Sequence, residues 1–378
     1  MAILQALGST LITEEELNEK RAIGQLGDFF EATDRGEEAT LSTSRGIVNT
    51  RDISEAAPVM HTPIGIGKPI NVEILCFYTG EAPSRFLGGK PDLLVSSAVK
   101  SHVTHDIAPL AINQLVDKIE NKVLIEPSAR SKGSPIVFYS PALDASTTLC
   151  SFQMVTESFN KSSMDQLGQL MGKASGMPVF APASSILMAG SVITKMVGNI
   201  GKKLAETRPF LKEDLNVRLD TAGLIETQAK QYVIVNDSDL NKIDGFELRL
   251  KTNTATGTNR VALCNIQTGK EYKGSAPYIV VNVDGKERPE LVNFTPKLAA
   301  SAVLERFYKG EDSSGDAVHL LENAMTLYND FTYYNKALKM KKDMNGMEVG
   351  SKAFERSSKL IDAYTKNITN EVFKSMIS

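Results

Sequence analysis

The hydrophobic positions of this chain follow two different periods, and the first is typical of strands. Residues 56–165 and residues 211–295 contain short apolar runs, such as INVEILCFY and QYVIV, each bounded by Gly, Pro, Ser or Asn. Short strands with long irregular connections favour antiparallel packing. We therefore predict one mainly antiparallel β-sandwich-like domain in each region, although the two strand sets could instead form one continuous core.

The second period is helical and dominates residues 166–210, between the two strand regions. Five apolar side chains recur there at helical spacing and define a predicted interaction face, namely Ile186, Ile193, Val197, Ile200 and Leu204. Lys195 and Asn199 lie near the middle of the same stretch, which disfavours a bilayer-spanning helix. We predict an amphipathic linking helix whose apolar side packs on a sheet, on a partner or on a membrane surface.

Both ends of the chain also carry helical patterns. Residues 1–55 form an N-terminal arm or helix in which Thr13 precedes three glutamates, as an N-cap residue would. This arm could dock on another subunit or on its own domain. Residues 296–378 form a helical C-terminal region, and a short helix is expected inside the first strand region at 107–119. The predicted fold class is α+β.

Charge, cysteine content and the N-terminal segment bear on the expected partners and on the cellular location. The 378 residues include 42 basic and 45 acidic side chains, giving a net charge of −3, so nucleic acid is not an expected partner. Cys76, Cys150 and Cys264 lie far apart within apolar segments, which predicts buried, reduced thiols. The N-terminus lacks a basic start followed by an apolar run. We therefore expect a cytoplasmic protein.

One histidine cluster is a candidate for chemistry. In the segment SHVTHD, His102 and His105 are three residues apart and Asp106 follows directly. Two imidazoles and a carboxylate can hold zinc or iron, which makes a metal-dependent hydrolase the alternative function. The sequence contains no Gly-x-Ser-x-Gly elbow, Walker A loop or His-Glu-x-x-His helix. No catalytic residue is assigned.

Two segments resemble the C-two β-sandwich family of calcium- and lipid-binding modules. In the first strand region, Gly89, Lys90 and Asp92 match a Gly-Lys-x-Asp sequence that leads into an apolar strand. In the second, KGSAPYIVVNVDG is similar to a Pro-Tyr-Val strand, and VNDSDLNKID resembles the acidic loop. The resemblance implies calcium ligands at Asp237, Asp239 and Asp244, which supply the oxygen donors that calcium selects.

These observations favour binding over catalysis. We expect a non-catalytic cytoplasmic protein that acts through apolar helix and β-edge surfaces, with another copy of itself as the leading partner. Another protein or a membrane surface is the alternative partner. No cofactor is expected except calcium, which would make membrane attachment calcium-dependent.

Overall fold

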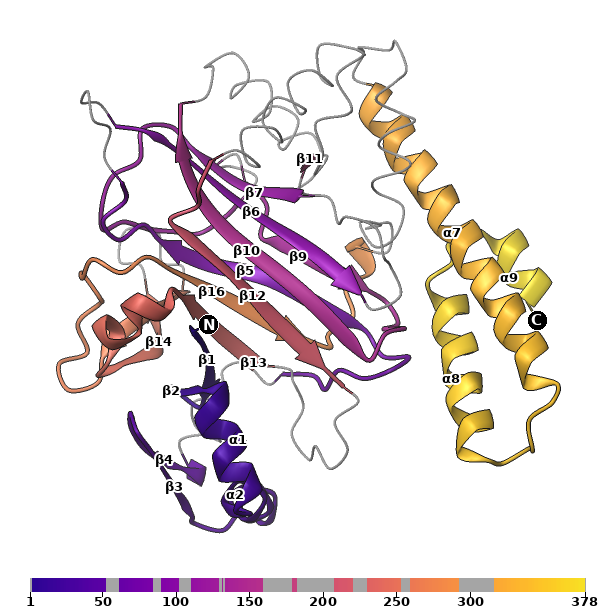
Figure 1. Cartoon of the computed structure of the whole chain (residues 1–378), viewed down its shortest axis with the longest axis horizontal. Helices are drawn as coiled ribbons and strands as arrows, with labels where there is room; N and C mark the ends of the chain where they lie inside the picture. Colours follow the sequence, from indigo (N-terminus) through magenta and orange to yellow (C-terminus); the bar gives the residue numbers. More distant parts are fainter. Residues whose placement is uncertain are drawn as a thin grey trace.

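A computed structural model describes most of the chain, with helices flanking two central sheets (Figure 1). All pairings between its named strands are antiparallel, so the mixture of helices and antiparallel sheets confirms the α+β class. The described residues are 2–51, 61–83, 90–101, 110–128, 131, 133–158, 179–181, 207–219, 230–252, 259–291 and 316–377.

Among the described residues, the larger sheet has seven strands, in the order β2-β1-β13-β16-β5-β8, with β9 also paired to β5. Their bounds are β1 Ala2–Leu7, β2 Thr10–Thr13, β5 Ile70–Tyr78, β8 Leu124–Ile125, β9 Ile136–Ser140, β13 Lys230–Val235 and β16 Tyr278–Asp284. Several of these strands read as nearly continuous apolar runs. Such runs indicate a sheet that is buried on both faces.

The described part of the smaller sheet has five strands, in the order β11-β7-β6-β10-β12. Their bounds are β6 Asp92–Ser101, β7 Leu110–Val116, β10 Thr147–Glu157, β11 Val179–Ala181 and β12 Leu211–Arg218. Along β10, buried and half-buried residues alternate from Thr147 to Met154, which is the pattern of a strand with one face toward a core.

The two sheets enclose one hydrophobic core. Ile70, Val72 and Ile74 of β5 share this core with Phe152 of β10 and with residues of β12, β13 and β16. Strands of the two predicted domains are also paired directly, because β5 joins β16 and β10 joins β12. The two strand regions therefore form a shared pair of sheets, as in the continuous-core alternative, and do not divide into two separate sandwiches.

The opposite face of the larger sheet is covered by the hairpin of β14 (Phe246–Thr252) and β15 (Asn259–Asn265) and by the short helix η2 (Asp237–Ile243). Tyr78 and Tyr278 stack beneath this cover with ring centroids 5.2 Å apart. The Tyr78 hydroxyl donates to the carbonyl oxygen of Gly274, so its buried polar atom is satisfied. The sheet is thus buried on both faces.

The N-terminal segment packs on its own domain. β1 pairs with β13, and α1 (Glu14–Ala22), α2 (Gln25–Arg35) and the hairpin of β3 (Thr40–Thr43) and β4 (Gly46–Asn49) follow it. Thr13 accepts a hydrogen bond from the Glu16 amide, which confirms it as the N-cap of α1. A small cluster that includes Leu17 and Phe29 holds these elements together.

The helix predicted at 107–119 is wrong, since its described part contains strand β7. This strand pairs with β6 and β11. Its interior residues Ala111 to Leu115 are all buried, so side chains on both faces of the strand are covered. A strand that is buried on both faces lacks the alternation that separates strand from helix, and its apolar residues fell by chance at helical spacing.

Three helices form the C-terminal helical unit, α7 (Asp316–Met344), α8 (Lys352–Lys366) and α9 (Glu371–Ile377). The helical C-terminus is confirmed for residues 316–377. The apolar pattern at 354–377 alone favours one continuous helix, but these residues belong to two helices, α8 and α9. The break occurs because Asp330 of α7 accepts hydrogen bonds from the amides of Thr369 and Asn370, which then no longer continue α8. Figure 1 shows the unit beside the sheets.

Candidate interaction face

The three predicted calcium ligands lie on or directly after η2, where two of them already have cationic partners. Asp239 is 2.7 Å from the Lys242 ammonium, and Asp244 is 2.7 Å from the guanidinium of Arg45. Asp237 begins the short helix. Calcium would have to compete with these ion pairs, so calcium binding at this loop stays a prediction for a metal titration.

Two other predicted sites lie outside the described residues. These are the histidine cluster of His102, His105 and Asp106 and the predicted interaction face of Ile186, Ile193, Val197, Ile200 and Leu204. The hydrolase alternative and the contact role of the linking helix at 166–210 therefore stay predictions.

Within the described part of the chain, no three His, Cys, Asp or Glu side chains come together in a way that would hold a metal ion. None of the described helices combines the length and the apolar character that spanning a bilayer requires.

The three cysteines are buried free thiols, as predicted. Burial raises the pKa of Cys150 to about 12, and it is also the main cause that raises the pKa of Cys76 and Cys264. Thiols with raised pKa values are protonated near neutral pH and are poor nucleophiles. Their environment fits a packing role.

A polar cluster at the ends of β5 and β16 combines a histidine, an arginine and two carboxylates. His61 is hydrogen-bonded to Asn282 at 2.8 Å, and Asp284 accepts from the amide of Thr62. Arg288 pairs with Glu73 at 2.6 Å. These contacts hold the segments before β5 and after β16 against the sheet. The cluster therefore has a structural role.

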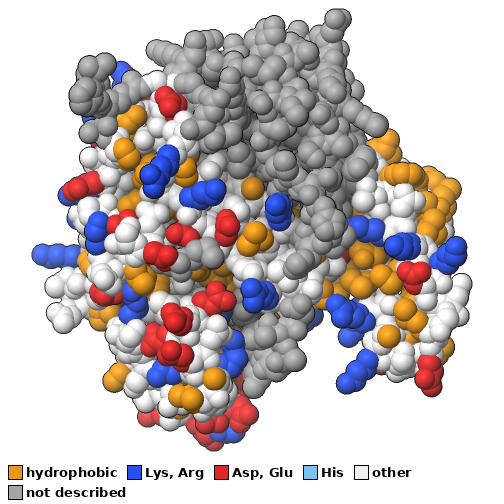
Figure 2. All heavy atoms as spheres, in the orientation of Figure 1, with side chains coloured by type: hydrophobic (Ala, Val, Ile, Leu, Met, Phe, Trp, Pro, Cys, Tyr) orange, Lys and Arg blue, Asp and Glu red, His pale blue; other side chains and the backbone are white. Residues whose placement is uncertain are grey.

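The C-terminal helical unit exposes large apolar side chains that its own core leaves uncovered. We call this set the C-terminal apolar face, which consists of Leu327 (56% exposed), Phe331 (53%) and Leu338 (38%) of α7 and Val372 (59%) and Met376 (57%) of α9. Figure 2 shows hydrophobic side chains gathering over this part of the molecule. Exposed apolar groups that gather on one part of a surface mark interaction sites in many soluble proteins.

Helix geometry explains why these residues gather. At 3.6 residues per turn, Leu327, Phe331 and Leu338 lie within about 40° of one another around the α7 axis. The rings of Phe331 and Phe373 are 6.4 Å apart, so this stripe adjoins α9. A second side of α7, about 100–140° around the axis from the middle of this stripe, carries Tyr333 and Ala337, which are buried in the core of the unit.

Sequence reasoning missed this face. In the sequence alone, the neighbouring aromatic residues Tyr328, Phe331, Tyr333 and Tyr334 favour a seal between helix and sheet. Tyr333 is buried against the other C-terminal helices, whereas Phe331 is exposed. The sequence does contain a signal for this face. Apolar residues recur at helical spacing at 327, 331, 334 and 338, and these positions form a different stripe of the helix from the buried positions 333 and 337.

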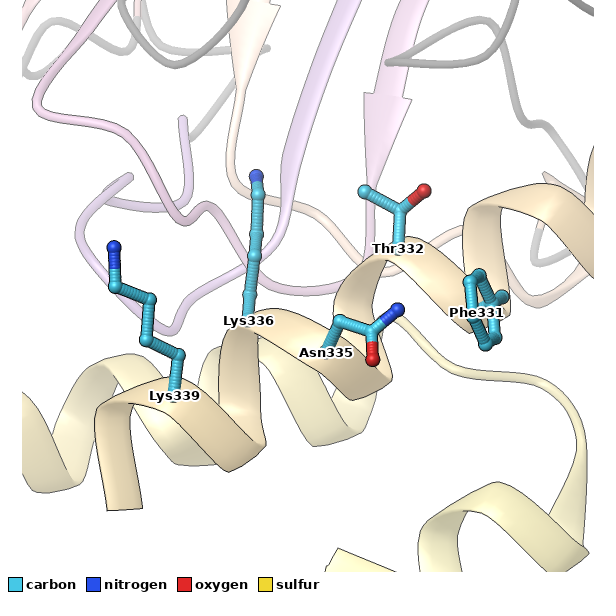
Figure 3. A pocket seen from close by; sticks show the side chains of 5 residues that line it. All are labelled: Phe331, Thr332, Asn335, Lys336 and Lys339. Atoms are coloured by element: carbon cyan, nitrogen blue, oxygen red, sulfur yellow. The ribbon is translucent and has the colours of Figure 1, made fainter. Parts of the chain in front are cut away.

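A polar contact lies on a third side of α7. The Lys336 ammonium is 3.5 Å from the Asp144 carboxylate in the β9–β10 connection, and both side chains are mostly buried. Figure 3 shows that Thr332, Lys336 and Lys339 extend from α7 toward the sheets. An open hollow of about 410 Å³ adjoins them, lined by Phe331, Thr332, Asn335, Lys336 and Lys339.

The edge strand of the smaller sheet is a weaker candidate for contact. In the order of the described strands, β12 is last and pairs with β10 on one side. It carries Lys212, Glu213, Asp214 and Arg218 among its eight residues. Charged residues on an edge strand oppose pairing with a further strand, so the helical face is the better interaction surface.

Comparison with known proteins adds no relative: no protein-family model matches the chain, and no significant match was found among curated proteins.

Proposed function

We propose that this chain is a non-catalytic, cytoplasmic binding protein that assembles with a second copy of itself through the C-terminal apolar face. The observation that carries the proposal is the exposure of Leu327, Phe331, Leu338, Val372 and Met376 on two adjacent helices. An isolated exposed leucine needs no explanation, but five such side chains on one small helical unit favour a surface that becomes covered.

The charge pattern of α7 favours a second copy as the partner. Asp330 and Lys336 already have partners within the chain. Apart from these two, the half from 316 to 330 carries Asp316 and Glu322 and no lysine or arginine, whereas the half from 331 to 344 carries three lysines and one aspartate. An antiparallel copy of α7 would place each acidic half beside a basic half. Phe331 lies near the middle of the helix, where the two-fold axis of such a pair would pass.

The expected assembly is weak. Full burial of five half-exposed side chains on each of two copies would contribute about 10 kcal/mol, at about 1 kcal/mol for each side chain. Association itself costs about 4–15 kcal/mol. The two terms are comparable, so we expect a dimer that forms with rising concentration, in the range of about 1 μM to 1 mM.

Measuring the mass in solution tests the proposal. We expect the average mass from sedimentation equilibrium to rise from that of the monomer toward that of the dimer over this range, and lipid vesicles to leave the protein in the supernatant. A monomer mass at every concentration would refute self-assembly. Sedimentation with anionic vesicles by a protein that stays monomeric would instead assign the face to membranes.

A further inference from the structure

The C-terminal helical unit has a hydrophobic core of its own. Among the described residues, this core contains Tyr333 and Ala337 of α7, Tyr364 of α8, Ile377 of α9 and Ile368 between α8 and α9, and no side chain of the sheets. Tyr334 and Phe373 add a stacked pair with ring centroids 5.2 Å apart. Side chains from all three helices thus pack together, which is the property of a body that can keep its fold when it is separated from its neighbour.

The contacts that tie this unit to the sheets, among the described residues, include a polar set that we call the latch. The Ser140 hydroxyl at the end of β9 donates to the side-chain oxygen of Asn367 at 2.8 Å, and the Asn367 amide donates to the carbonyl oxygen of Ala142. Lys336 pairs with Asp144 two residues further along. The latch therefore joins one short connection, 140–144, to α7 and to the end of α8.

The ion pair of the latch is largely shielded from water and lies near two aromatic rings. The Lys336 ammonium lies 5.1 Å from the ring centroid of Tyr333 and 5.6 Å from that of Tyr364. Burial lowers the pKa of Lys336, although the neighbouring Asp144 acts in the opposite direction. Desolvation of both charges cancels much of their attraction, so such a pair fixes orientation more than it adds stability.

We infer that α7, α8 and α9 form a docked body that the latch holds in one orientation against the sheets and that separates from them without unfolding when the latch is broken. Polar interfaces between packed bodies are typical of contacts that open and close, whereas permanent ones are larger and more apolar. The inference is independent of the proposed function, because it concerns the sheet-facing side of α7.

Asp144→Ala tests the inference, because it leaves the ammonium of Lys336 buried without its carboxylate. We expect amide hydrogen exchange in residues 140–146 to become at least about tenfold faster, with α7 around Ala337 and Met340 keeping its parental protection. The double variant Asp144→Ala/Lys336→Met removes both charges and should return the exchange rate toward that of the parent. All proteins are measured at a concentration where the parent is monomeric.

Glu371→Ala is the matched control, since it breaks the exposed pair of Glu371 and Lys374 within the unit and leaves the latch intact. We expect parental exchange in both segments. Two outcomes for Asp144→Ala would overturn the inference: no acceleration at 140–146, or equal acceleration there and inside α7. The second outcome would mean that the helices unfold when they lose the sheets.

Discussion

Replacing Phe152 by alanine is expected to lower the free energy of unfolding of the two sheets by about 3–5 kcal/mol. The Phe152 side chain is fully buried, so its loss leaves a cavity and removes apolar surface from the core. Phe152 belongs to the first strand region, yet it shares its core with Ile234 and Val281 of the second. The loss should therefore weaken both regions together.

Hydrogen exchange followed by mass spectrometry measures this effect. We expect peptides from β6 and β10 and peptides from β13 and β16 to lose the same protection free energy in Phe152→Ala. Ser151→Ala is the matched control, because Ser151 is the half-buried neighbour of Phe152 on the same strand and should change stability by less than about 0.5 kcal/mol. Unchanged protection of β13 and β16 would show that the two regions unfold separately.

Replacing Lys230 by methionine is expected to change the pH dependence of stability. Lys230 begins β13 and is buried, and its ammonium group donates to the Gln5 side chain at 3.0 Å. Burial, with a smaller contribution from Arg21, lowers its pKa from 10.5 to about 7. The unfolded chain keeps this proton up to its ordinary pKa, so unfolding takes up a proton between about pH 7 and pH 10.5.

This proton uptake determines whether stability rises or falls with pH. Lys230 contributes a gain in stability as the pH rises through that window, of at most about 1.4 kcal/mol per pH unit. The buried cysteines act in the opposite direction above their ordinary pKa, because burial raises the folded pKa of each thiol. The informative quantity is therefore the difference between variant and parent at each pH. Lys230→Met should be the more stable protein at pH 6, and its advantage should shrink toward pH 9.

Urea unfolding of parent and variant from pH 6 to pH 9 gives this difference directly. Lys212→Met is the matched control, since Lys212 is an exposed strand lysine on β12. It should follow the parent at every pH. A difference between Lys230→Met and the parent that does not vary with pH would show that Lys230 keeps its ordinary pKa in the folded protein.

Local features of the fold could be predicted from the sequence. Thr13 followed by glutamates identified the start of α1, because an N-cap depends on residues adjacent in the chain. Apolar runs identified β5, β10, β13 and β16, and the flanks of Cys76 and Cys150 identified buried thiols. Each of these signals is local.

Strand pairing could not be predicted, because it depends on partners far apart in the chain. β5 pairs with β16 about 200 residues later, and no property of either segment indicates that the other is its partner. The same limit explains β7, whose apolar residues fit a helix until β6 and β11 supply its hydrogen-bond partners. For the same reason, the sequence did not show that the two strand regions share their sheets.

The C-terminal apolar face shows a further limit of prediction from sequence. Periodicity in the segments with Ile186 and with Phe331 predicts a helix that has one apolar side, but it does not tell which apolar residues another part of the chain covers. On α7, Tyr333 is covered and Phe331 is exposed although they are two residues apart. That distinction arises only from the packing of α8 and α9.

The most direct test of the central claim, assembly through the C-terminal apolar face, is sedimentation velocity of Phe331→Asp beside the parent across the same concentration range. Ile23→Asp is the matched control, because Ile23 is also an apolar residue that is more than half exposed, at the end of α1. Our account predicts that the sedimentation coefficients of the parent and of Ile23→Asp increase with concentration, while Phe331→Asp stays a monomer throughout. An unchanged concentration dependence in Phe331→Asp would contradict it.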